Sequence, residues 1–206
     1  MIKKMHVLLL CSLVPIYTQQ LLNRSEKVTI KRKLSNFSVY GDIDFRTTND
    51  RGLYYRHFET GTIIPIGKTW SASLQYRNIY TKSVEKWKLE KRPKAQIQKT
   101  INTQQLKWSV RSLQEYRIRT GKKDALRNRV RVMAKSNQNW NGLKPFVGNE
   151  FFYDMEKNEY NKNWIVVGFD LSKIGLTAPT IYYKHISDYI NGAWVHTYTM
   201  VVKFNI

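Results

Sequence analysis

The chain has 206 residues, a length that allows one domain with its own core but not two large ones. Its 42% hydrophobic content excludes a disordered chain. A mean hydropathy of −0.52, with no apolar run of about twenty residues beyond the N-terminus, excludes a helical membrane protein. Thirty-five Lys and Arg against fifteen Asp and Glu give a net charge of +20, which points to an acidic partner such as nucleic acid or an anionic lipid.

Residues 1–18 have the pattern of a secretory signal peptide. Lys3 and Lys4 precede an apolar stretch from Val7 to Tyr17, and two polar glutamines follow. We therefore expect the chain to be exported. Cys11 is the only cysteine and lies inside this segment, so the mature chain would contain neither a disulfide nor a thiolate metal site.

The rest of the chain alternates between apolar and polar residues, as half-buried strands do. The alternation is clear from Phe37 to Arg46 and clearest from Trp194 to Ile206. The charged stretch from Lys82 to Lys91 has too few apolar residues for a helix and is interpreted as a loop with a helical turn. Turn signals such as Asn-Gly divide the chain into about ten expected strands. They cover residues 36–46, 53–63, 68–80, 93–103, 105–119, 124–137, 144–155, 161–172, 176–187 and 193–206.

Long amphipathic strands without helices leave two architectures, a soluble β-sandwich or small barrel and a transmembrane β-barrel. The expected spans are close to the roughly 9–11 residues of a tilted membrane-crossing strand, whereas soluble strands average about five or six. Aromatic residues such as Trp70, Tyr80 and Trp164 stand near strand ends, and the polar faces carry charges that a wet or ion-paired interior accommodates. These features favour an all-β fold, an up-and-down antiparallel transmembrane barrel over residues 36–206, with about ten strands and eight to twelve possible.

This architecture predicts a location in the bacterial outer membrane. Residues 19–35 would form a periplasmic segment ahead of the barrel, both termini would lie in the periplasm, and the charged loop over 82–92 would face outward. The expected partners are outer-membrane lipids and lipopolysaccharide, and the barrel assembly machinery during biogenesis. We expect a monomer and no nucleic-acid partner, because export removes the chain from the cytoplasm and its basic residues are spread over every strand and loop.

Charged residues spaced an even number of positions apart, and therefore on one face of their strand, predict a network inside this barrel. They fall on three successive expected strands, which would lie about 4.8 Å apart. The residues are Arg111, Glu115 and Arg117 on the first strand, Arg127, Arg129 and Arg131 on the second, and Glu150 and Asp154 on the third. Paired charges of this kind fill a small lumen. Because arginines outnumber carboxylates, the lumen could be structural or bind a phosphorylated or carboxylate ligand; a narrow anion-selective channel is an alternative.

A second alternative is a lipid esterase or deacylase. His185 and Ser187 stand in a string similar to the His-x-Ser-Asn signature of outer-membrane lipid A deacylases, in which a histidine activates a serine hydroxyl. Asp188 replaces the asparagine, and a hairpin turn also explains the residues that follow. No catalytic residues are favoured, and an enzyme is not the expectation. His57 and His196 are interpreted as isolated interfacial residues, and neither a metal nor a cofactor is expected.

Four short motifs resemble, in this order, those of domain-of-unknown-function family 2490. They are the segments Arg92–Gln98, Lys107–Arg117, Arg127–Arg131 and Gly148–Phe152. The resemblance covers roughly residues 36–206. It implies a small outer-membrane β-barrel of Gram-negative bacteria, and thus a fold and a location but no activity.

Overall fold

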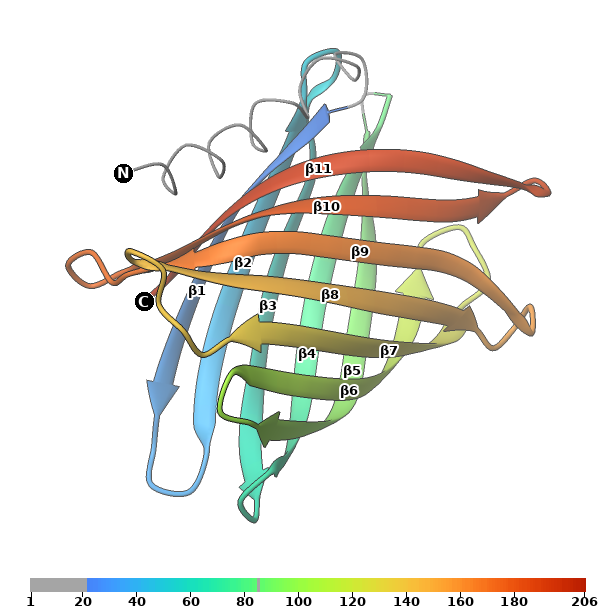
Figure 1. The fold of residues 1–206 in the computed structure, drawn as a ribbon. Helices are drawn as coiled ribbons and strands as arrows, with labels where there is room; N and C mark the ends of the chain where they lie inside the picture. The colour runs from blue at the N-terminus through green and yellow to red at the C-terminus, as the bar shows by residue number, and fades with distance from the viewer. Residues whose placement is uncertain (1–21, 85) are drawn as a thin grey trace.

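The computed structural model describes residues 22–84 and 86–206, which form eleven strands closed into a barrel (Figure 1). The strands are β1 (Leu22–Lys33), β2 (Ser38–Thr48), β3 (Gly52–Ile66), β4 (Trp70–Ser83), β5 (Lys86–Asn102), β6 (Leu106–Arg119), β7 (Ala125–Ser136), β8 (Leu143–Asp154), β9 (Glu159–Leu171), β10 (Ala178–Ile190) and β11 (Ala193–Asn205). The expected signal peptide over 1–18 lies outside the described residues. In the two described ranges, no helix has the length and apolarity needed to cross a membrane.

The strands follow one another around the barrel in sequence order, each pairing antiparallel with the next. Short turns join them because the residues there suit tight hairpins. Between β10 and β11, Asn191 and Gly192 adopt φ values of 51° and 83°, the positive values that a two-residue hairpin turn requires. The all-β barrel expected from the alternation is confirmed, and its eleven strands fall within the expected range.

Strand β1 is the strand that the expected set lacked. It occupies residues 22–33, which the sequence analysis placed ahead of the barrel. Its buried positions include Asn23 and Ser25, and its other face carries Arg24 and Glu26, so hydropathy does not alternate there. Only pairing with its two neighbours identifies this segment as a strand.

The barrel closes through parallel pairing of β1 with β11, in register from Leu22 opposite Tyr198 to Thr29 opposite Asn205 (Figure 1). An odd number of strands in a closed meander forces this pairing to be parallel. The start of β1 therefore lies toward the barrel end opposite the one where β11 finishes. The described chain begins beside Tyr198 in the middle of β11, and the N-terminal residues on which the expectation of two periplasmic termini rests lie outside the described residues.

The charged stretch over 82–92 is also corrected. It is not a long loop, because β4 and β5 continue through it as a hairpin with Ser83 opposite Lys86. Strand pairing on both sides overrides the high charge, because Glu90 and Arg92 fall on the same face of β5 as buried Lys94 and form ion pairs inside the barrel.

The interior of the barrel is polar and the outside is apolar. Apart from glycine and proline, the buried side chains of the described ranges comprise sixteen polar or charged residues and seven apolar ones. The outer face exposes apolar side chains on neighbouring strands, for example Val130 and Val132 on β7 and Val147 and Phe151 on β8. This inverts the arrangement of a water-soluble domain, in which apolar side chains fill the core.

Candidate functional site in the barrel interior

The centre of the interior is an ion-pair cluster built by β6, β7 and β8. Glu115 on β6 is 0% exposed and accepts hydrogen bonds from Arg127 Nε at 2.6 Å and Arg129 Nη1 at 3.1 Å. Arg129 Nε also donates to Glu150 at 2.9 Å, and Arg111 pairs with the same carboxylate. Five of the residues selected by parity are thus in direct contact. Register places these groups together, because Glu115 lies directly opposite Arg127. Glu150 lies opposite Arg131 and reaches Arg129, two residues away on the same face of β7.

The other three selected residues lie elsewhere in the interior. Arg117 pairs with Glu90 on β5, with Nε donating to the carboxylate at 2.6 Å. Arg131 forms no ion pair with any described residue, although it faces inward. Asp154 accepts hydrogen bonds from the backbone amides of Glu156 and Lys157 and from Asn161, so it orders the turn between β8 and β9.

A second charged cluster, on β2 to β5, was missed by the sequence analysis. Asp42 and Asp44 on β2 face His57 and Glu59 on β3, and Arg77 and Lys94 on β4 and β5 complete it. Lys94 Nζ donates to Glu59 at 2.6 Å. Residue spacing could have identified this cluster. Asp42 and Asp44 are two residues apart on one expected strand, and His57 and Glu59 are two apart on the next, so each pair shares one face of its strand.

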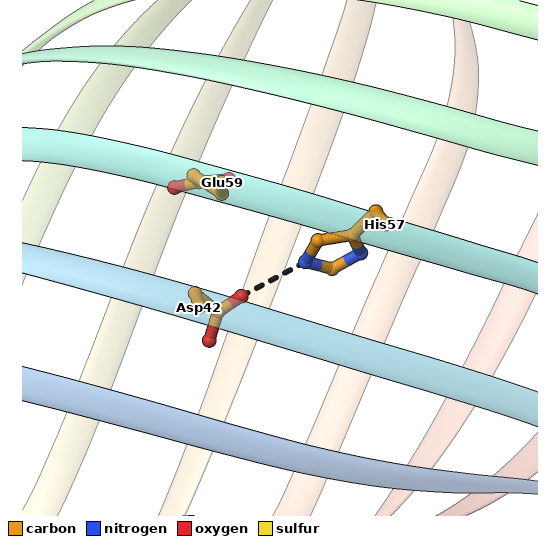
Figure 2. Close-up of side chains that lie close together, drawn as sticks. All are labelled: Asp42, His57 and Glu59. Carbon is orange, nitrogen blue, oxygen red and sulfur yellow. Dashed lines mark hydrogen bonds and ion pairs between the residues drawn. The ribbon is translucent and has the colours of Figure 1, made fainter.

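The position of His57 corrects its interpretation as an interfacial residue. Its side chain is 1% exposed and lies inside the barrel, with Nε2 at 2.8 Å from a carboxylate oxygen of Asp42 (Figure 2). Tyr55 Oη lies 3.0 Å from its other ring nitrogen. Both ring nitrogens are therefore engaged.

Asp42, His57 and Glu59 have ligand atoms that all lie within 4.8 Å of one another, a spacing that a metal ion could bridge. Their oxygens, however, are held by cations of the protein. Lys27 Nζ lies 2.9 Å from Asp42, and Glu59 is paired with both Arg77 and Lys94. A divalent cation would have to displace these positively charged side chains from the carboxylates and would be repelled by them. We therefore assign the three residues to the ion-pair network.

A cationic chamber lies beside these clusters inside the barrel. It has a volume of about 280 Å³. Its lining comprises Arg46, Tyr55, Arg77, Arg92, Arg117, Arg127, Arg129, Asn161, Lys162, Trp164, Asp188 and Tyr189. Seven of these side chains are cationic and one is acidic. A larger cavity of about 510 Å³ opens at the other barrel end, near Lys135, Lys144 and Asp170. The ion-pair clusters stand between the two.

His185 and Ser187 lie on the outer face of the barrel. Ser187 Oγ is 3.0 Å from Nδ1 of His196 on β11, and His185 Nε2 is 3.2 Å from the same atom. The histidine beside the serine is thus His196, which was expected to be isolated. Asp188 points to the opposite face and pairs with Lys162. Within the described ranges no carboxylate hydrogen-bonds to either histidine.

The fold and its interior define a class, a closed β-barrel with a charged, side-chain-filled lumen. The family model described as "Protein of unknown function (DUF2490)" matches residues 26–188. The chain therefore belongs to this family. The match includes all four motifs quoted above, and these lie on the consecutive strands β5 to β8. The search of curated proteins and the search of solved structures each returned no match.

Proposed function

We propose that this protein is a small transmembrane β-barrel of the bacterial outer membrane. Its lumen is closed by ion pairs, and its role is structural or ligand-binding rather than conductive. The observation that carries the proposal is the inverted distribution of side chains, with charges inside and apolar groups outside.

The outer apolar surface supports the membrane location. Large apolar side chains exposed in the middle of the strands include Phe58, Leu74, Ile97, Val147 and Met200. Exposed aromatic residues stand near strand ends, with Trp70 and Trp108 toward one barrel end and Tyr160 and Trp194 toward the other. Such aromatic residues flank the apolar band of barrels that cross a bilayer. Leaving this surface in water would create a continuous apolar patch that monomeric soluble proteins avoid.

Membrane fractionation tests this proposal. We expect the chain, expressed in a Gram-negative host, to band with the outer membrane in a sucrose gradient. Unboiled samples should migrate differently from boiled ones on a gel, because a closed barrel resists unfolding by detergent. A chain recovered in the soluble periplasm, with no mobility change on boiling, would overturn the proposal.

The closed lumen predicts little conductance. The ion pairs of Glu115, Arg129 and Glu150, on the neighbouring strands β6, β7 and β8, occupy the interior between the two cavities. We expect no large single-channel steps from purified protein in a planar bilayer. Anion-selective steps of porin size would instead favour the channel alternative, since the lumen is cationic.

The lipid-esterase alternative has one observation in its favour, the 3.0 Å approach of Ser187 Oγ to His196 Nδ1 on the face that would meet acyl chains. A serine nucleophile also needs its base oriented by a third group and donors for the developing oxyanion. Strand pairing uses the backbone donors around Ser187, which lies opposite His196 and Asn163. The structural or ligand-binding role therefore remains our proposal.

A further inference from the structure

The chamber concentrates positive charge beyond what its carboxylates balance. Its seven lining cations contact six carboxylates, namely Asp44, Glu59, Glu90, Glu115, Glu150 and Asp188. Two of these carboxylates, Glu59 and Glu150, also form ion pairs with Lys94 and Arg111, so nine cations share six carboxylates. Buried Lys184, with Nζ 4.5 Å from the Trp164 ring, adds another cation that forms no ion pair with a described residue. Buried charge without a counter-charge is costly, so an anion in the chamber would stabilise the barrel.

The donors suit an oxyanion. Six of the lining cations are arginines, whose planar forks donate paired hydrogen bonds to phosphate and carboxylate oxygens. The Nε1 donor of Trp164 is buried and has no hydrogen-bond partner among the described residues. At about 280 Å³ the chamber is smaller than the roughly 300–1,000 Å³ of pockets for drug-sized ligands. A small, multiply charged anion fits these limits better than a monocarboxylate, which would offset only one of the surplus charges.

The chamber is placed for access from one end of the barrel. Arg46, Arg117, Arg127 and Tyr189 lie within three residues of the ends of their strands, next to the connections opposite the end where β11 finishes. The wall around them is continuously hydrogen-bonded, so a ligand must enter along the barrel axis rather than from the side. This favours a soluble ion over a headgroup attached to acyl chains.

We infer that the chamber is a binding site for a small tetrahedral dianion, inorganic phosphate or a soluble phosphate monoester. The inference deepens the proposed function by naming a ligand class for the lumen of that barrel. It does not depend on conduction, because the ion-pair clusters that close the lumen also hold the arginines that face the ligand.

Arg117→Gln is the variant that tests the site with least damage to the fold. Arg117 lines the chamber and pairs with Glu90, but Glu90 also accepts a hydrogen bond from Arg92 Nε at 2.8 Å. Removing Arg117 therefore leaves no carboxylate unpaired. Arg51→Gln is the matched control, since it removes the same charge from the exposed β2–β3 turn at the same barrel end.

The experiment titrates inorganic phosphate into the full chain folded in detergent, at low ionic strength, by calorimetry and by tryptophan fluorescence. We expect saturable binding by the wild type, an affinity lowered about tenfold or more in Arg117→Gln, and an unchanged affinity in Arg51→Gln. A heat-dependent gel shift shows that each variant is folded. No saturable binding at millimolar phosphate, or equal binding by Arg117→Gln, would overturn the inference.

A second titration uses short-chain phosphatidic acid in the same micelles. Binding of this lipid without binding of inorganic phosphate would overturn the soluble ligand in favour of a headgroup. A barrel that fractionates with the outer membrane and binds no phosphate refutes only this inference. A phosphate-binding chain absent from the outer membrane refutes only the proposed function.

Discussion

Replacing Glu115 by glutamine is expected to lower the free energy of unfolding by about 3–5 kcal/mol, the cost of removing one partner from a buried ion pair. Glu115 is fully buried and lies against Arg127 and Arg129, with Arg92 Nη1 at 3.5 Å. The amide keeps the shape of the side chain but not its charge. Arg127 would then keep no carboxylate partner among the described residues, and Arg92 and Arg129 would each keep only one, Glu90 and Glu150.

The loss is measured by urea unfolding of the detergent-folded barrel, with the heat-dependent gel shift as a second readout. Glu156→Gln provides the matched control, because Glu156 pairs with Lys123 in exposed connections and should change stability by less than about 1 kcal/mol. Equal midpoints for the two variants would show that the central cluster does not support the barrel.

A second variant, Gly168→Ala, is expected to destabilise the barrel by about 3 kcal/mol or to prevent its closure. Gly168 on β9 lies opposite Tyr182 on β10. An added Cβ would lie 2.7 Å from Tyr182 Cα and would also overlap Tyr182 Cβ and the backbone oxygen of Ile181. These atoms belong to the paired strand and to a ring packed on Phe146, so they cannot move without breaking the ladder.

Gly41→Ala is the control for this variant. An added Cβ at Gly41 on β2 meets no atom of the described part of the chain within 4 Å, and alanine suits a strand better than glycine does. We expect its unfolding midpoint to match or exceed that of the wild type. Equal unfolding midpoints for Gly168→Ala and Gly41→Ala would mean that β9 and β10 can accommodate a Cβ at position 168, for which the structure leaves no space.

The central cluster could be found before the structure because its residues repeat with a period of two on three successive strands. Once Arg127 and Glu115 are assigned to one face, antiparallel pairing makes them neighbours. The cluster of Asp42, His57 and Glu59 follows the same rule but is less conspicuous, since single acidic residues and one histidine are common on solvated faces. These residues form a cluster only once the pairing of β2 through β5 places Glu59 next to Arg77 and Lys94.

The amino-acid sequence by itself determined that the chain is all β, that its strands are long, and that charges fall on one face and apolar groups on the other. These properties depend on local alternation, which each of the strands from β2 onward displays by itself to some degree. The tertiary structure alone decided that residues 22–33 join the barrel, that β1 meets β11 in parallel, and that a cationic chamber forms beside the clusters. Each of these depends on the number of strands and on the register between them, and those are properties of the closed sheet rather than of any one segment.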